Sequence, residues 1–149
     1  MGIDPRGPRF NASITTAVLA VVLVTGSVWL LAAQGLVFAA GSIFGLRYSP
    51  YGWLYRRLVR PRLGPPSELE PEAPPRFAQT VGLAFAAVGV VGYATGLTAL
   101  GMAATAAALA AALLNAAIGF CLGCEMYLLI RRIWPGQATL VPAHADKED

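Results

Sequence analysis

The last long apolar run of the chain, from Met102 to Ile130, contains the stretch Gly119-Phe120-Cys121-Leu122-Gly123-Cys124-Glu125-Met126-Tyr127. This stretch holds both cysteines of the chain, three positions apart, and a carboxylate follows the second one directly. The run ends at Arg131-Arg132 and is longer than the roughly 20 residues that a transmembrane helix needs. We therefore expect a membrane-spanning helix that carries a chemical site, with the rest of the chain as its scaffold.

The composition indicates a small polytopic membrane protein with a single domain. Of its 149 residues, 56% are hydrophobic and 13% are charged, and the mean hydropathy is +0.60. Soluble domains carry about a quarter of charged residues, so an ordinary soluble fold is excluded. The net charge of +3 comes from arginines at the ends of apolar runs. It therefore reports membrane orientation and gives no support to nucleic-acid binding.

The apolar runs predict an all-α fold, an integral membrane four-helix bundle. Tight turns are expected at Gln34-Gly35 and at Thr98 to Gly101. The segment 61–75 holds six prolines and is expected to be a cytoplasmic loop without secondary structure. A polar tail without fixed structure is expected at 136–149. The predicted spans are 12–33, 36–58, 78–97 and 102–130.

The second of these spans has two readings. It crosses the membrane as one helix only if Arg47 and Pro50 lie within it, and Pro50 should kink or break a helix. The alternative is a shorter, tilted helix to Leu46, followed by an interfacial segment from Tyr48 to Leu58. The sequence does not separate the two.

The distribution of basic residues predicts which side of the membrane the termini occupy. Ten of the eleven basic residues lie in the N-terminal segment, the central loop and the C-terminal tail, and the two predicted turns carry none. By the positive-inside rule, both termini and the central loop are expected in the cytoplasm. The protein is thus expected in the plasma (inner) membrane as a multi-pass protein.

Short motifs suggest an internal repeat of two parallel helical hairpins. Pro8-Arg9-Phe10 recurs as Pro75-Arg76-Phe77, each just before an uncharged run. Further matches are weaker, and under this repeat the cysteine pair belongs to the second half alone. Glycine pairs at four-residue spacing should let helices approach closely, within the bundle or in a homodimer. The weaker matches are Phe44-Gly45-Leu46 with Phe120-Cys121-Leu122 and Tyr51 with Tyr127; the glycine pairs are Gly41/Gly45, Gly92/Gly96 and Gly119/Gly123.

Cys121 and Cys124 are the candidate redox pair. On a continuous helix both sulfurs share one face, and Glu125, at i+4 from Cys121, is a candidate for proton handling. Reactivity needs thiolate, which the C-terminal end of a helix disfavours. The helix could break at Gly119, which would place the pair in the first turn of a new helix. Otherwise a cation must be near, and Arg47, the only one within an apolar segment, is the candidate for thiolate stabilisation.

Plainer readings exist for each of these residues. Cysteines are tolerated in buried helices as small apolar residues. Arg47 could extend its guanidinium to the headgroups, and Glu125 could be protonated or interfacial. A soft metal cation on two thiolates and Glu125 has too few ligands in one chain, so no metal is expected. The sole histidine, His144, lies in the polar tail, which excludes a histidine-based site.

The chain resembles a family of small bacterial integral membrane proteins, domain of unknown function 4395, frequent in actinobacteria. The resemblance rests on three segments and covers nearly the whole chain. It implies thiol or sulfur metabolism, with a thioredoxin-like protein or a sulfurtransferase as partner. The segments are Asp4-Pro5-Arg6-Gly7-Pro8-Arg9-Phe10-Asn11-Ala12, Pro75-Arg76-Phe77-Ala78 and Phe120-Cys121-Leu122-Gly123-Cys124.

The layout is also similar to membrane disulfide-forming enzymes coupled to quinone. This chain lacks their second cysteine pair, and its own pair is expected in the cytoplasmic half, so quinone coupling is disfavoured and no cofactor is identified. Our leading hypothesis is a membrane thiol–disulfide or sulfur-metabolism protein. The alternative is a non-enzymatic membrane scaffold or carrier subunit with structural cysteines.

Overall fold

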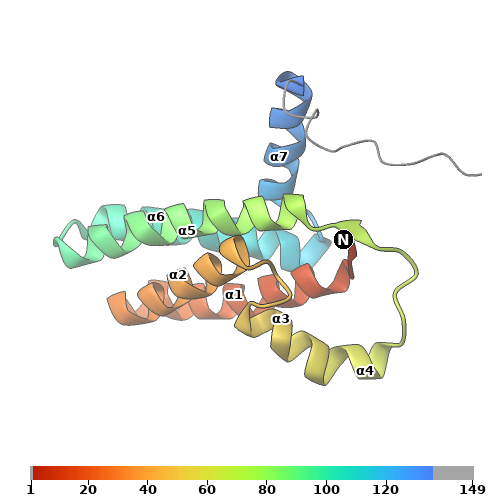
Figure 1. The fold of residues 1–149 in the computed structure, drawn as a ribbon. Helices are drawn as coiled ribbons and strands as arrows, with labels where there is room; N and C mark the ends of the chain where they lie inside the picture. Colours follow the sequence, from red (N-terminus) through yellow and green to blue (C-terminus); the bar gives the residue numbers. More distant parts are fainter. Residues whose placement is uncertain (1, 136–149) are drawn as a thin grey trace, which may run out of the picture.

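The computed structural model of the chain describes residues 2–135 and is all-α apart from two very short strands. The long helices α1 (Arg6–Thr25), α2 (Val28–Ile43), α5 (Ala73–Ala94) and α6 (Thr98–Ile118) lie alongside one another (Figure 1). By length and apolar composition, α1, α5 and α6 could each cross a membrane, which fits a membrane protein. Helix α2, at 16 residues, is shorter than the roughly 20 that a span needs. The predicted polar tail at 136–149 lies outside the described residues.

The first hairpin turns at Gly26-Ser27, so the prediction of a turn at Gln34-Gly35 is wrong. Gly26 ends α1 with φ 64°, a left-handed conformation that glycine adopts without a steric penalty. Ser27 then caps α2, because its side chain accepts a hydrogen bond from the backbone N–H of Leu30 at 3.3 Å. Both helices are therefore displaced towards the N-terminus relative to the predicted spans.

Gln34 lies inside α2 and is only 1% exposed. Its side-chain nitrogen donates to the Thr15 hydroxyl at 3.4 Å, and its carbonyl oxygen accepts from the Tyr51 hydroxyl at 2.7 Å. Burial is tolerated because these bonds satisfy the amide. The side chain of Gln34 on α2 therefore links Thr15 on α1 with Tyr51 on the following segment. A helix residue with long-range bonds stands where the sequence suggested a turn.

The second predicted span is broken, which is the alternative that Pro50 indicated. Helix α2 ends at Ile43, and residues 44–49 lead into α3 (Pro50–Leu54). The Ser49 hydroxyl caps α3 by accepting from the N–H of Gly52 at 3.1 Å. Proline is favourable at a first helical position because its missing N–H is not needed there. The chain continues as a π-helix, η1 (Tyr55–Val59), and then as α4 (Arg60–Leu63).

The fourth predicted span, 102–130, is wrong as a single helix. Helix α6 begins at Thr98, so the turn lies at 95–97 and not at Thr98 to Gly101. It ends at Ile118, where Gly119 adopts φ 74°. Helix α7 (Leu122–Ile133) then leaves the bundle in a different direction (Figure 1).

The proline-rich segment is more structured than we predicted for 61–75. Helix α4 extends to Leu63, and α5 already begins at Ala73. Between them, strand β2 (Glu70–Pro71) pairs antiparallel with strand β1 (Gly2–Ile3). The pairing ties the N-terminus to the segment that connects the two halves of the chain.

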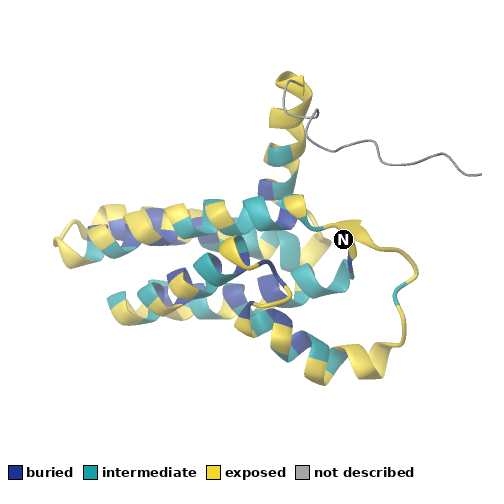
Figure 2. Ribbon diagram, viewed as in Figure 1, coloured by how far each residue is buried: buried dark blue, intermediate teal, exposed yellow. Residues whose placement is uncertain are grey.

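The core lies between the four long helices. Helix α1 packs along α6, α2 packs along α5, and α5 also packs against α6. Figure 2 shows that α4 and most of α7 are exposed, in contrast to the inward faces of the bundle. The buried core residues are Leu19, Val22, Leu31, Phe38, Ala86 and Ala108.

The two halves of the chain cap each other through equivalent arginines. Arg9 on α1 donates to the carbonyls of Ala116 and Ala117 at the end of α6, at 3.5 Å each. Arg76 on α5 donates to the carbonyls of Ser42 and Ile43 at the end of α2, at 2.9 Å each. These are the arginines of the two Pro-Arg-Phe motifs, so the repeated motif makes a repeated contact.

The phenylalanines of the same motifs also make matching contacts. The rings of Phe10 and Tyr55 are 5.6 Å apart at 48°, and those of Phe77 and Tyr127 are 5.7 Å apart at 48°. By contact, the counterpart of Tyr127 is therefore Tyr55, four residues beyond the Tyr51 that the sequence match suggested. Segment α3–η1 thus occupies, in the first half, the place that α7 occupies in the second.

The glycine pairs combine two functions. One member of each pair lies at a close helix contact: a Cβ on Gly92 would lie 2.9 Å from the Cα of Gly101, for example. The other member has positive φ and ends a helix or lies in a turn: these are Gly45, Gly96 and Gly119. The predicted close packing therefore holds for one residue of each pair.

Candidate functional site

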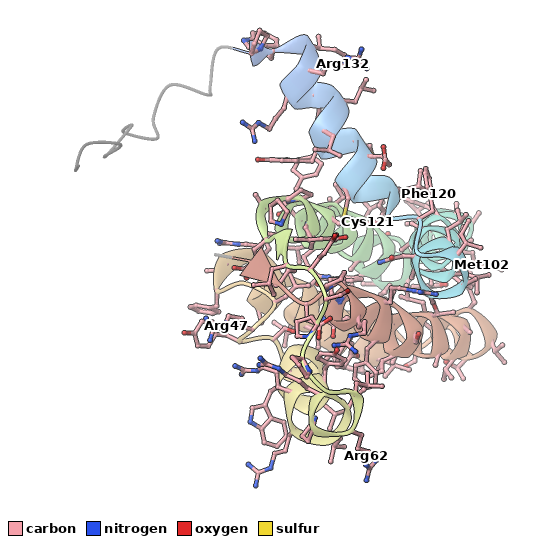
Figure 3. All side chains as sticks on the ribbon, turned by 90° about the vertical axis from the view of Figure 1, so that its right-hand side faces the viewer. Arg47, Arg62, Met102, Phe120, Cys121 and Arg132 are labelled. Carbon is pink, nitrogen blue, oxygen red and sulfur yellow. A yellow bond between two sulfur atoms is a disulfide. The ribbon has the colours of Figure 1, made fainter. Side chains whose placement is uncertain are left out.

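The cysteine pair lies where α7 begins. Gly119 ends α6, and Cys121 adopts an extended conformation with φ −88° and ψ 98°, which suits the residue that caps the next helix. The sulfur of Cys121 accepts a hydrogen bond from the N–H of Cys124 at 3.3 Å. Cys121 and Cys124 form a disulfide. Figure 3 shows Cys121 where α7 meets the bundle.

This position resolves the electrostatic difficulty that the sequence posed. A pair at the C-terminal end of a long helix would face a dipole that disfavours thiolate. The break at Gly119 instead places both cysteines at the N-terminus of α7, where the unpaired N–H groups favour negative charge. Of the two remedies we considered, the break at Gly119 is the one that the structure has.

Arg9 is the cation beside this turn, and sequence reasoning missed it. A Cβ placed on Gly119 would lie 3.6 Å from Arg9 Nε, so the guanidinium lies against the turn that leads to Cys121. The sequence feature that could have indicated Arg9 is the Pro-Arg-Phe repeat, because a repeated arginine suggests a repeated structural contact. Its distance from the cysteines along the chain concealed the contact.

Arg47 and Glu125 are both exposed. Arg47 follows the end of α2 and lines cavities formed with η1 and α3, apart from the cavity at Cys121 (Figure 3). Glu125 lies in the first turn of α7, where a carboxylate complements the helix dipole. The structure keeps Glu125 next to the cysteines but does not bring Arg47 into their cavity.

An open cavity of about 260 Å³ adjoins Cys121 between the helices of the bundle. Five helices contribute to its walls: α1, α2, α5, α6 and α7. The walls are mainly apolar, and the polar side chains among them are Thr15, Gln79 and Asn115. Cys121 therefore lines this cavity, whereas Cys124 does not, and both cysteines are half-buried.

The first half of the chain has the same cap without the cysteines. Ser49 caps α3 through the N–H of Gly52, as Cys121 caps α7 through the N–H of Cys124. Both caps come six residues before the tyrosine that contacts a motif phenylalanine. The local fold therefore needs a cap at this point but does not need a disulfide.

Within residues 2–135, no three side chains of the His, Cys, Asp and Glu types are grouped closely enough to hold a metal ion. His144 lies outside the described residues.

A second polar cluster lies at the same end of the bundle, around Asp4. Its carboxylate accepts hydrogen bonds from the side chain and backbone of Arg6 and from the Tyr55 hydroxyl, all at 3.0 Å. Burial opposes its charged form, but the bonds from Arg6 and Tyr55 outweigh burial and hold the pKa of Asp4 below its usual 3.8. Burial, followed by the bond to Asp4, raises the pKa of Tyr55 above its ordinary value.

The lowered pKa of Asp4 predicts a loss of stability in acid. A carboxylate whose pKa is lowered by folding contributes fully above its unfolded pKa, and the contribution is lost as the pH falls through the folded value. We expect Asp4→Asn to cost about 1–2 kcal/mol near neutral pH, from the lost charged hydrogen bonds. The variant should lose less than the native protein between about pH 5 and pH 3. Thermal unfolding in detergent measures this, with exposed Glu68→Gln as control; equal acid sensitivity of all three proteins contradicts it.

A family model described as a domain of unknown function, DUF4395, matches residues 3–132. The matched range begins in β1 and runs to the last turn of α7, so it includes the disulfide and both Pro-Arg-Phe motifs. No curated protein and no solved structure matches the chain. The chain belongs to the DUF4395 family, as its resemblance at Asp4 to Ala12, at Pro75 to Ala78 and at Phe120 to Cys124 indicates.

Proposed function

We propose that the protein is an integral membrane thiol–disulfide protein whose Cys121–Cys124 pair exchanges with a thioredoxin-like protein. The observation that carries the proposal is the placement of a Cys-x-x-Cys disulfide at the N-terminus of a separate helix. Helix N-termini favour thiolate, which is the nucleophile and the leaving group of exchange. The cap alone does not explain two cysteines here, because Ser49 caps α3 in the same way without a disulfide.

The geometry supports Cys121 as the leaving thiolate. Its sulfur already accepts the N–H of Cys124, and Arg9 lies beside the preceding turn. A thiolate of the partner would attack the sulfur of Cys124, forming a mixed disulfide and expelling Cys121 as thiolate. The partner's second thiol would then attack its own mixed-disulfide sulfur, closing the partner's disulfide and releasing Cys124.

In this direction two electrons pass to the membrane protein, the partner is oxidised and both cysteines are reduced. The reverse sequence reduces the partner, and the two reduction potentials set the direction. Glu125, exposed in the same turn as the pair, would exchange the proton with the departing thiolate. Arg47 lies beyond the C-terminal end of α2 and outside the cavity at Cys121. Its predicted role in thiolate stabilisation stays a prediction that mutation can test.

The orientation we propose places the disulfide at the cytoplasmic face of the plasma membrane. The basic residues of α3 to α4 and of α7 follow the ends of α2 and α6, as the positive-inside rule requires of a cytoplasmic side. Both segments combine these arginines with exposed apolar residues, among them Trp53, Leu58, Leu128 and Leu129. This composition is typical of helices that lie in the membrane interface. On this proposal, four helices span the bilayer and the short α2 spans it with the help of its flanking segments.

Single-cysteine variants test the exchange. In membranes, Cys121→Ser should accumulate a mixed disulfide on Cys124 with a thioredoxin-like protein, because the thiol that would resolve it is gone. Cys124→Ser should accumulate less, and the double variant none. Non-reducing gels followed by mass spectrometry identify the adduct. If both thiols stay reduced and form no adduct under oxidising and reducing conditions, the proposal fails and the scaffold alternative remains.

A further inference from the structure

We propose that the first half of the chain binds a phosphate ester that also carries hydroxyl groups, held by Arg56 and Asn11. The headgroup of a polyol phospholipid and a free polyol phosphate share this chemistry. The site is a cavity of about 240 Å³. That volume suits a headgroup but not a whole lipid. Its walls come from β1, α1, α3, η1, α4 and the segments that lead into α3 and β2.

The cavity carries a positive charge. Arg56 and Arg60 line it, and guanidinium groups are the preferred partners of phosphate oxygens. Asp4 also lines it, but the Asp4 carboxylate is paired with Arg6 at 3.0 Å and bonded to Tyr55. The remaining field therefore favours an anion.

Two residues that line this cavity each hold a buried polar atom that has no hydrogen-bond partner in the part of the chain that the structure describes. One is Arg56 Nε, a donor, although Arg56 Nη2 donates to the backbone carbonyl of Arg47 at 2.8 Å. The other is Asn11 Oδ1, an acceptor on a residue only 5% exposed. A buried polar group without a partner is costly and calls for an explanation. A phosphate oxygen would satisfy the donor, and a hydroxyl on the same ligand would satisfy the acceptor.

Comparison with the second half shows that the fold does not require these atoms. Asn11 follows Phe10, whereas Ala78 follows Phe77; Arg56 follows Tyr55, whereas Leu128 follows Tyr127. In the second half, Ala78 and Gly123 line the mainly apolar cavity beside Cys121, so the corresponding positions carry no polar side chain. The two halves therefore differ in the groups they carry: the second half has the disulfide, and the first half has a cavity lined by arginines and Asn11.

Lipid selectivity of the full-length protein tests the inference. In detergent, short-chain phosphatidylglycerol, which carries phosphate and hydroxyls, should bind at least about tenfold more tightly than phosphatidylcholine, whose headgroup has no hydroxyl. Native mass spectrometry and thermal shift measure this on the native sequence, so the comparison holds even if a variant fails to fold. Equal binding of the two lipids overturns the proposal.

Variants locate the site. Arg56→Lys and Asn11→Ala should each weaken phosphatidylglycerol binding by about tenfold, the loss expected for one hydrogen bond to a charged or buried group. Arg57→Lys is the matched control, because Arg57 stacks on Trp53 and does not line the cavity. An equal loss in Arg57→Lys would mean general charge attraction and would overturn the site.

Soluble ligands separate the two sources. Glycerol 3-phosphate that competes as well as the lipid identifies a free phosphate ester, and competition by the lipid alone identifies a membrane headgroup. Inorganic phosphate should compete more weakly than glycerol 3-phosphate, since it lacks the carbon-bound hydroxyls; equal competition contradicts a role for Asn11. Cys121→Ser should bind like the native protein, so failure of this site and failure of the proposed exchange are distinguishable.

Discussion

Replacing Gly123 with leucine is expected to force α7 away from α5. A Cβ at this position would lie 2.6 Å from both the Cα and the Cβ of Ala78, and a backbone atom cannot move aside as a flexible side chain can. Overpacking of this kind costs about 1–3 kcal/mol, and here the exposed helix yields more easily than the bundle. The Phe77–Tyr127 ring contact should be lost with it.

The displacement should be visible as limited proteolysis between α6 and α7 and as a lower unfolding temperature in detergent. Disulfide exchange with thioredoxin should change as well, because the wall of the cavity beside Cys121 moves. Leu128→Met, a change of similar volume on an exposed position of the same helix, is the control and should behave like the native protein. An unchanged cleavage pattern in Gly123→Leu would show that α7 does not depend on this contact.

Removing Arg9 is expected to slow the reaction of the reduced cysteines with an alkylating reagent. A guanidinium near the start of α7 favours thiolate, so Arg9→Ala should reduce alkylation near neutral pH by about three- to tenfold. The pH profile of alkylation should shift to higher pH. The variant should also lose about 1 kcal/mol of stability, because the carbonyls at the end of α6 lose their donor.

The repeat supplies a matched control for Arg9. Arg76→Ala removes the same kind of cap from α2 and should cost at least as much stability, because its hydrogen bonds are shorter. It should leave alkylation unchanged. Arg47→Ala tests the residue that the sequence favoured for thiolate stabilisation. If Arg47→Ala slows alkylation and Arg9→Ala does not, the assignment to Arg9 is wrong.

The sequence predicted the helical class and the apolar runs, because composition and length carry those signals. It also singled out the two cysteines, which form a disulfide, while their role in exchange stays a prediction. It missed the turn at Gly26-Ser27, since two small residues within an apolar run are weak evidence beside a polar pair such as Gln34-Gly35. Gln34 itself is buried because Thr15 and Tyr51 bond it, and neither partner is a neighbour in sequence.

For the site, the limits were of the same kind. The possible break at Gly119 was visible, because glycine is the residue that adopts positive φ at the end of a helix. The contact of Arg9 with that turn was not visible, because it joins residues more than a hundred positions apart. A long-range contact of this kind depends on which helices pack together, and hydropathy alone does not specify that.

The reciprocal arginine caps bear on the origin of the chain. Arg9 closes the end of α6 and Arg76 closes the end of α2, so each hairpin depends on the other for one of its own ends. An ancestral protein with a single hairpin could have kept this contact only as a symmetric pair of identical subunits, each arginine reaching across to its neighbour. We infer that gene duplication and fusion would then have freed the two copies to diverge, one with the disulfide and the other with the arginine-lined cavity.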